Sequence, residues 1–242
     1  TPDPENLYNG RDNFTPPAVW FPYTLARSVS GMAEMTDDRF GSFRGQLLVG
    51  DFQNALVARV FLEKINGEYQ GAVFPLLNGF RSGVNRLSYG PDGCLYVGGL
   101  QRTWVSIAPD PASLERVTFN GNTPFSIRKA EAKPDGFLLT FTEPTRPSAA
   151  DPDNFDVSQF RYAYHPDYGS PRFNHAGEKD SQTPIELTNA TLSPNRLELH
   201  LSLSGWREGH VTQVRCYDVM NDAGESLWHD TFHYTLNEIP AP

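Results

Sequence analysis

The sequence predicts an all-β protein. Aromatic residues make up 12% of the 242 residues, and 20 glycines and 20 prolines supply abundant turn formers. Patterns typical of long amphipathic helices are few, and this combination is characteristic of chains built from short strands and tight turns. The chain is long enough for one large domain, or for two ordinary domains with cores of their own.

The clearest predicted element is a hairpin in the first half of the chain. Residues 84–89 and 94–97 each have the composition of a short strand, and the turn between them reads Gly-Pro-Asp-Gly at residues 90–93. In such a turn the proline presets φ, the aspartate caps the backbone locally, and the second glycine takes a positive φ. Two short strands around a tight turn are typical of a β-propeller blade.

A looser copy of this hairpin precedes it. Three motifs recur between the two copies. Ser-Gly-Met at 30–32 matches Ser-Gly-Val at 82–84, an offset of 52 residues, and Gly-Gln-Leu-Leu-Val-Gly at 45–50 matches Gly-Cys-Leu-Tyr-Val-Gly at 93–98, an offset of 48. Ala-Arg-Val at 58–60 matches Glu-Arg-Val at 115–117, an offset of 57. Recurrence at this spacing predicts two successive propeller blades with loop insertions.

The remaining strands of the first half follow from apolar runs between turn formers. We expect strands at residues 19–23, 28–35, 46–62 with a loop around 53–54, 69–77 and 114–119. Pro22 places the first of these at a sheet edge or a strand end, because proline cannot donate to a ladder. Residues 1–18 read as an irregular lead-in, and residues 100–112 as a longer connection.

The spacing of the predicted strands changes near residues 120–124. Beyond them we expect seven separated strands, at 125–130, 136–141, 155–164, 185–192, 196–203, 210–219 and 227–236. Residues 196–203 alternate strictly, so that Leu197, Leu199, Leu201 and Leu203 face a core. This spacing describes an immunoglobulin-like β-sandwich. The predicted domains are therefore a partial β-propeller of about two blades, residues 1–120, and the sandwich, residues 121–242.

Charge and hydropathy exclude two classes of partner. The formal net charge is −9 and the pI is about 5.1, with no basic stripe, so a nucleic-acid binder that tracks phosphates is not expected. No apolar run approaches the ~18–20 residues that a membrane-spanning helix needs. The polar, acidic start carries no secretion signal, so we expect either that a signal was removed or that the chain is a piece of a longer protein.

Several motifs in order resemble one family over nearly the whole chain. They are Val19-Trp-Phe-Pro-Tyr23, Phe40-Gly-Ser-Phe-Arg-Gly-Gln-Leu-Leu-Val-Gly50, the run from Arg59 to Ala72, Ser82-Gly-Val-Asn-Arg86 with its turn, Thr123-Pro-Phe125, Tyr168-Gly-Ser-Pro171 and Tyr234-Thr-Leu-Asn237. They resemble the C-terminal part of large exported bacterial proteins with a glucose/sorbosone (soluble quinoprotein sugar) dehydrogenase propeller, often fused to c-type cytochrome domains. The resemblance implies a six-bladed propeller followed by an immunoglobulin-like domain, located outside the cytoplasm in the periplasm, at the cell surface or secreted. This chain corresponds to about the last two blades and that domain.

The resemblance also implies where a cofactor would be held. Proteins of this family bind pyrroloquinoline quinone (PQQ) and calcium, with an Arg-x-Arg pair before the Gly-Pro-Asp-Gly turn and a lysine after the preceding Leu-x-Val-Gly strand. Here the two arginine positions fall on Gly83 and Asn85, and the lysine position falls on Gln53. Arg81 and Arg86 lie nearby, and a shift of the alignment by one residue would bring Arg86 onto the site. Because a tricarboxylate requires concentrated positive charge, we expect no cofactor in this chain, and PQQ and calcium only in a full-length protein.

A second candidate site consists of aromatic residues. Trp20, Tyr23, Arg102 and Trp104 are candidates for a carbohydrate platform, because aromatic faces stack on the C–H surfaces of sugars; the alternative for each is packing in a core or between blades. We expect no metal site. His229 and His233 lie four residues apart on a strand, about 13 Å, which is too far to share an ion.

Weaker candidates have simple structural alternatives. His165 and His175 flank a turn and could converge on a metal, but surface or capping roles are the alternative. Residues 151–156 resemble a calcium loop faintly and a plain turn more closely. Cys94 and Cys216 are expected to be buried free thiols.

Two functions follow as hypotheses from these patterns. The first is a C-terminal segment of an exported, sugar-dehydrogenase-like propeller protein, with a structural or docking role and no catalytic residue of its own. Its partners would be the remaining blades or another chain, together with a c-type cytochrome domain. The alternative is a non-catalytic module that binds glycans or proteins at the cell surface. A partial propeller completed by oligomerisation is a third reading, because two blades leave sheet faces and edges uncovered.

Overall fold

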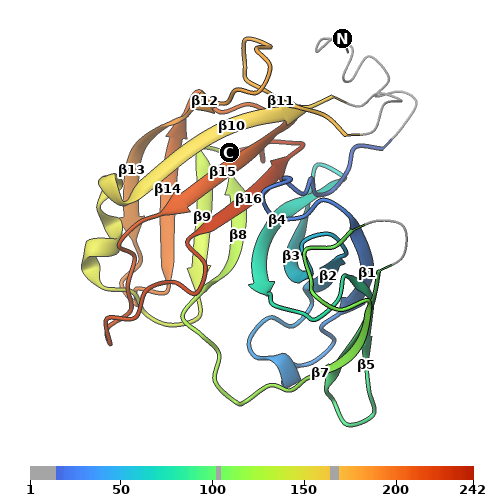
Figure 1. The fold of residues 1–242 in the computed structure, drawn as a ribbon. Helices are drawn as coiled ribbons and strands as arrows, with labels where there is room; N and C mark the ends of the chain where they lie inside the picture. Colours follow the sequence, from blue (N-terminus) through green and yellow to red (C-terminus); the bar gives the residue numbers. More distant parts are fainter. Residues whose placement is uncertain (1–14, 102–104, 164–168) are drawn as a thin grey trace.

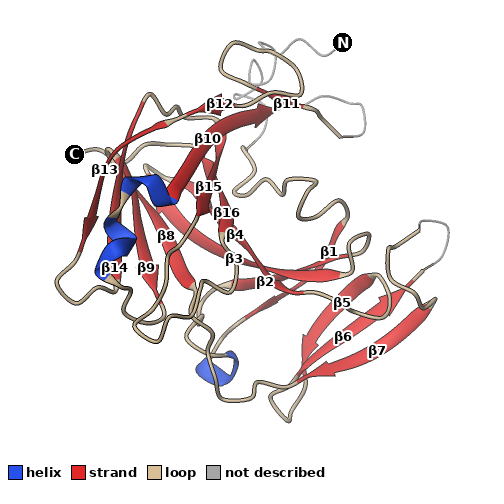
Figure 2. Cartoon of the chain, turned by 60° about the vertical axis from the view of Figure 1, so that its left-hand side comes forward, coloured by secondary structure: helices blue, strands red, loops and turns tan. Residues whose placement is uncertain are grey.

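The computed structural model describes residues 15–101, 105–163 and 169–242. Over these described residues the protein is all-β, with 48% strand and 4% helix, and its antiparallel sheets do not close into a barrel. The all-β prediction is therefore confirmed. Figures 1 and 2 show a long sheet running through the molecule, a second sheet against one end of it and a small sheet against the other end.

The largest sheet has nine strands in the order β1-β2-β3-β4-β16-β15-β10-β11, with β12 also paired to β10. Their bounds are β1 Val29–Glu34, β2 Leu47–Asp51, β3 Leu56–Ile65, β4 Glu68–Leu77, β10 Phe155–Tyr162, β11 Arg172–Phe173, β12 Thr183–Pro184, β15 His210–Cys216 and β16 Thr231–Leu236.

The two smaller sheets have the orders β13-β14-β9-β8 and β5-β6-β7. Their bounds are β8 Ile127–Lys133, β9 Gly136–Phe141, β13 Glu186–Leu192, β14 Glu198–Ser204, β5 Val84–Tyr89, β6 Leu95–Leu100 and β7 Ala112–Val117. Short 3₁₀ helices occupy η2 Asp38–Phe40, η3 Pro147–Ala150 and η4 Pro152–Asn154.

The main core lies between the four-stranded sheet and strands β4, β16, β15 and β10. Its centre is aromatic: the ring of Phe137 lies 4.9 Å from that of Tyr234, 5.2 Å from Trp206 and 6.2 Å from Phe232. Phe137 comes from β9, whereas Phe232 and Tyr234 alternate along β16, so the two sheets pack face to face. Strand alternation sends these residues inward because successive side chains point to opposite faces.

A second core lies between the first strands of the large sheet and the small sheet β5-β6-β7. It joins Leu48 and Val57 to Val84, Leu95 and Val97, all of which are buried. The opposite face of β2, β3 and β4 is covered by the segment that precedes β1, through side chains such as Leu25 and Ala26.

Strands from both sides of the predicted boundary at residues 120 and 121 share the large sheet. Strand β4 pairs directly with β16, in the register Val73 with His233 and Gly71 with Thr235. A Cβ atom at Gly71 would lie 1.9 Å from the carbonyl oxygen of Phe61, so only glycine fits there. The two halves of the chain are thus joined by a continuous ladder of strands.

The hairpin around residues 90–93 forms as predicted. Gly93 has φ +78°, its N–H donates to the Gly90 carbonyl at 3.0 Å, and Asp92 accepts from the N–H of Cys94 at 3.2 Å. The alternation of β14 is also confirmed for Leu199, Leu201 and Leu203, which are buried.

The predicted strand at residues 19–23 is wrong. This segment is irregular and ends in a turn, in which the Pro22 carbonyl accepts from the N–H groups of Leu25 and Ala26 at 2.8 and 2.9 Å. Proline removes one ladder donor, and the turn withdraws the carbonyl of the same residue, so the apolar side chains pack on the sheet without joining it.

Candidate functional site

The candidate site is a groove where the small sheet, the end of β4 and the loop before β16 meet. It encloses about 380 Å³, which lies within the range of ligand pockets. We call it the junction groove, and its lining residues are Phe40, Phe43, Leu76, Leu77, Val117, Thr118, Phe119, Asn120, Asn122, Thr123, Pro124 and Trp228.

One wall of the junction groove is built from phenylalanines held by their own contacts. Phe40, at the end of η2, stacks on Phe119 with ring centroids 6.4 Å apart and an interplanar angle of 29°. It also meets Tyr89 edge to face at 5.7 Å. The chain turns here at Gly41, whose φ of +82° and 2.7 Å approach of an added Cβ to Thr123 Oγ1 both require glycine.

Trp228 forms the exposed lip of the groove. Its indole Nε1–H donates to the Leu76 carbonyl at 3.2 Å, and its backbone N–H donates to the Phe125 carbonyl at 2.8 Å. The residue nevertheless remains 57% exposed. One hydrogen bond thus orients the indole and the other holds the backbone at Trp228, so a large aromatic residue is positioned before a ligand arrives, which lowers the entropy cost of binding.

Neutral polar groups also line the groove. Asn120 and Asn122 are exposed, and the Asn120 side-chain oxygen accepts from the Asn122 N–H at 2.9 Å, which shapes the segment between β7 and β8. Among the described residues, none of the side chains that line the groove is ionisable. The groove therefore offers apolar faces, hydroxyls and amides for binding, and no general acid, base or charged nucleophile.

A buried arginine lies directly behind the groove. Arg59 of β3 is 2% exposed, and its guanidinium is sandwiched between the rings of Phe43 and Phe74 at 4.2 and 4.1 Å. It donates to the carbonyls of Ile127 and Arg128 at 2.7 and 2.8 Å, and to the Gln46 side chain.

The buried position of Arg59 affects both its pKa and the packing of the groove. Burial lowers the pKa of this guanidinium to about 9. The side chain also ties β3 to β8 across the two sheets, and because Phe43 lines both the groove and the arginine, it holds the groove's inner wall in place.

The predicted cofactor positions make separate local contacts. Arg81 pairs with Asp110 at 2.6 Å, and the exposed Arg86 turns back to the Asn85 carbonyl at 2.8 Å. The Gln53 carbonyl accepts from Ile107 and from the Ser106 hydroxyl.

Gly83 tests the fit of the quinone, because a Cβ atom there would lie 2.5 Å from the Phe52 carbonyl oxygen. A side chain at this position has no room. With Arg81 neutralised by Asp110 and Arg86 exposed, these residues do not fit an enclosed tricarboxylate quinone.

The predicted carbohydrate platform is only partly within the described residues. Trp20 packs against Tyr162 with ring centroids 5.4 Å apart, and the backbone N–H of Trp20 donates to Thr235 Oγ1 at 2.8 Å. Tyr23 is 41% exposed and its hydroxyl occupies the space beside Gly169. Arg102 and Trp104 lie outside the described residues.

The histidines considered above as metal ligands contact other groups in the structure. His229 contacts the Leu76 carbonyl at 3.3 Å, whereas the buried His233 contacts the Gln213 side chain at 3.1 Å. His175 bonds to Gln159 at 3.0 Å and its ring lies 4.7 Å from that of His210; His165 lies outside the described residues. Across residues 15–101, 105–163 and 169–242, no group of three or more His, Cys, Asp or Glu could hold a metal ion.

Two further predictions are confirmed. Cys94 and Cys216 are both buried and free, and burial raises the pKa of the Cys216 thiol beyond its usual range. Asp151 caps the 3₁₀ turn η4 by accepting from the Asp153 N–H at 3.1 Å, so this segment is a turn.

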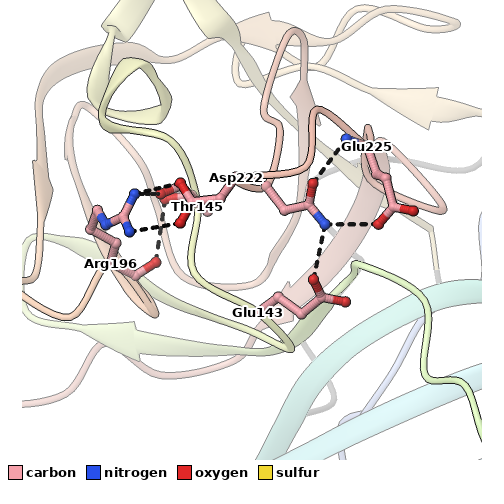
Figure 3. Close-up of polar contacts among 6 residues, drawn as sticks. Glu143, Thr145, Arg196, Asp222 and Glu225 are labelled. Atoms are coloured by element: carbon pink, nitrogen blue, oxygen red, sulfur yellow. Dashed lines mark hydrogen bonds and ion pairs between the residues drawn. The ribbon is translucent and has the colours of Figure 1, made fainter.

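A dense polar cluster beside the main core holds neighbouring loops together by hydrogen bonds, and we call it the structural lock (Figure 3). Arg196 forms a two-pronged ion pair with Asp222 at 2.6 and 2.7 Å and also donates to the Thr145 carbonyl. The buried Asn221 amide donates to both Glu143 and Glu225, at 2.9 and 2.8 Å, and its oxygen accepts from the Glu225 N–H. The carboxylates are therefore already engaged with donors from the same loops.

Replacing Asn221 by aspartate is expected to lower the free energy of unfolding by about 2–3 kcal/mol. The change removes the donor between Glu143 and Glu225 and adds a third negative charge. Asn195→Asp is the matched control, because that exposed side chain acts here through its oxygen, which accepts from Ser193 and Leu197. Urea denaturation measures both, and equal stability of the two variants would contradict the assignment of a lock.

Comparison with known protein families, with curated proteins and with solved structures finds no match to this chain. Within the described part of the chain, no helix is long and apolar enough to cross a membrane. The site must therefore be interpreted from its own geometry.

The junction groove was missed at the sequence level. Residues 120–124 were assigned only as a boundary, and Trp228 was absorbed into a predicted strand at 227–236, whereas β16 begins at Thr231. An available signal was the Trp-His-Asp sequence at 228–230, which breaks the alternation expected of a strand.

Proposed function

We propose that this chain is a non-catalytic binding module whose junction groove holds one or two rings of a neutral carbohydrate. The observation that carries the proposal is Trp228, an exposed tryptophan at an aromatic groove whose indole N–H and backbone N–H are both hydrogen-bonded. Pre-positioned aromatic faces are suited to the C–H surfaces of sugar rings.

The polar composition of the groove supports a neutral ligand. Asn120, Asn122, Thr118 and Thr123 supply amides and hydroxyls at the rim, which can donate to and accept from sugar hydroxyls. The lining residues contribute no formal charge, so an anionic or cationic ligand would gain no direct ion pair there. This favours the glycan-binding hypothesis over a catalytic one.

Replacing Trp228 by alanine is expected to weaken binding of neutral oligosaccharides about 30-fold, corresponding to the loss of about 2 kcal/mol for an anchoring aromatic ring. A panel of gluco-, galacto-, manno- and xylo-oligosaccharides titrated into the full chain by calorimetry would measure this. Tyr23→Ala is the matched control, because it removes an exposed ring of the other predicted platform. Loss of binding in Tyr23→Ala but not in Trp228→Ala would move the site, and no binding across the panel would overturn the proposal.

A second candidate is favoured by the repetition of two meanders in the first half of the chain. We propose that β1–β4 and β5–β7 are consecutive propeller blades, and that residues 121–242 form an immunoglobulin-like sandwich. The packing of the two meanders through a shared core supports this reading. On this view the chain is a structural or docking segment of an exported sugar-dehydrogenase-like protein with a c-type cytochrome partner, outside the cytoplasm.

The second candidate predicts activity only in a longer protein. A full-length protein in which residues outside this chain hold PQQ and calcium should reduce a dye in the presence of aldoses, whereas this chain alone should not. Absence of dye reduction by the full-length protein would remove this candidate and leave the glycan-binding proposal untouched.

A further inference from the structure

Strand β7 forms an open edge of the small sheet. It pairs with β6 on one side, and no other described strand pairs with it. Figure 2 shows it as the outermost strand of its sheet, with the molecule lying on the other side. Open edges are where strands of another chain can add.

The backbone groups that face outward can be identified. Gln101 donates to the Pro111 carbonyl at 2.6 Å, just before β7 begins. In an antiparallel pair every second residue bonds to its neighbour, so the odd-numbered residues of β7 bond to β6. The N–H and C=O groups of Ala112, Leu114 and Arg116 therefore point away from the sheet.

Other strand edges of the protein carry protecting features that β7 lacks. The register of β1 with β2, of β8 with β9 and of β13 with β14 is interrupted in each case by a bulge or irregularity. In β8, Arg59 also occupies the carbonyls of Ile127 and Arg128. The pairing of β7 with β6 runs without a break over all six residues of β7. The edge has no proline and no bulge, and its two charged residues, Glu115 and Arg116, already have partners within the chain, so it can pair with another strand.

Two exposed leucines lie beside this edge. Leu114, at the centre of β7, is 74% exposed, and Leu100 of β6 is 38% exposed. Leu100 and Leu114 lie on the same face of the sheet, because Leu100 pairs with Ala112 and Leu114 follows two residues later. An apolar patch beside an open edge marks an interaction surface.

We propose that the open edge of β7 pairs with β7 of a second copy of this chain, antiparallel and centred on Leu114. This register places Leu114 opposite Leu114 of the partner subunit, and Ala112 opposite Arg116 of the partner subunit. All three outward-facing residues of each strand then bond to outward-facing residues of the other. The two small sheets become one sheet of the order β5-β6-β7-β7-β6-β5.

The charges of β7 select this register. Glu115 comes to lie opposite Ser113 of the partner subunit, and within its own chain it already accepts from the Ser113 hydroxyl at 2.9 Å. A register centred one residue later would set the two Glu115 carboxylates opposite each other. Like charges directly opposite destabilise a strand pair, so the centre falls at Leu114.

The first test is the mass of the full chain in solution. Light scattering coupled to size exclusion, over a wide range of protein concentrations, should show a monomer that becomes a dimer as concentration rises. Leu114→Lys is expected to weaken the dimer about tenfold or more, because two ammonium groups would then face each other. Met32→Lys is the matched control, an exposed apolar residue on the edge strand β1, and should leave the dimer unchanged.

The second test fixes the register. Leu114→Cys should form a disulfide-linked dimer on mild oxidation, since directly opposite residues lie about 5.5 Å apart at Cα, within disulfide reach. Met32→Cys should not, and the native cysteines are buried.

Each possible result of these two tests either supports or contradicts the proposed dimer. A monomer at all concentrations, a dimer that survives Leu114→Lys, or failure of Leu114→Cys to crosslink would overturn the proposal. Trp228→Ala should leave the dimer intact, so this test does not depend on the carbohydrate proposal.

Discussion

Replacing Arg59 by alanine is expected to lower the free energy of unfolding by about 3–5 kcal/mol. The substitution leaves the Ile127 carbonyl of β8 without its buried donor and the Gln46 side-chain oxygen without its arginine donor. The Arg128 carbonyl loses one of two donors, because the Gln46 amide also donates to it at 2.8 Å. It also opens a gap between Phe43 and Phe74, whose rings flank the guanidinium at 4.2 and 4.1 Å. Urea denaturation followed by fluorescence would measure the change.

Two other substitutions separate the causes. Arg59→Lys keeps a positive charge but cannot reach three oxygens with a planar fork, so an intermediate loss is expected. Arg44→Ala removes an exposed arginine from the neighbouring loop and should change stability by no more than about 0.5 kcal/mol. If Arg59→Ala proved as stable as Arg44→Ala, the guanidinium would not be the tie between β3 and β8.

Acidification from pH 6.5 to pH 4.5 is expected to lower the free energy of unfolding by about 3–5 kcal/mol. Burial lowers the pKa of His233 to about 3, with nearby Arg172 adding to the effect. Burial lowers the pKa of His210 to about 4, and neighbouring His175, Arg161 and Arg207 act in the same direction. The unfolded chain therefore binds more protons than the native protein in this window, and stability falls as pH falls.

The slope of this loss is set by proton counting. Each histidine that is neutral in the native state and charged in the unfolded state contributes up to about 1.4 kcal/mol per pH unit. Glu63 acts in the opposite sense, because burial raises the pKa of its carboxyl, so the measured slope is the net effect.

Neutral replacements provide the check. The double variant His210→Gln, His233→Gln should show a clearly flatter dependence of unfolding free energy on pH than the native chain, with each single variant in between. Thermal or urea unfolding at a series of pH values measures it. Parallel curves for the native chain and the double variant would refute the assignment of the slope to these two histidines.

The strands were accessible from sequence because they depend on local rules. The alternation at 196–203 predicted the buried leucines of β14, and the Gly-Pro-Asp-Gly turn predicted the hairpin of β5 and β6. Period-two patterns state which side chains share a face, but they do not name the strand that lies alongside. The pairing of β4 with β16 therefore had no signature in either strand, and the joined sheet could not be predicted.

The junction groove was inaccessible for a related reason. Its walls come from η2, the end of β4, the segment after β7 and the loop before β16, which lie far apart in sequence and meet only after the sheets pack. Val19–Tyr23 shows the converse case, since its apolar composition was read as a strand although it only covers a sheet. Its side chains contact the sheet, whereas its backbone does not pair with it.

The place of β16 bears on how fast the molecule can fold. Val73 of β4 pairs with His233, 160 residues further along the chain, and β16 then receives β15 on its other side. The centre of the longest sheet therefore cannot close until a very large loop has been brought together, and such non-local pairings slow the search for the native state. We therefore expect refolding in the range of milliseconds to seconds, because the two ends of this sheet are joined only when β16 pairs with both β4 and β15.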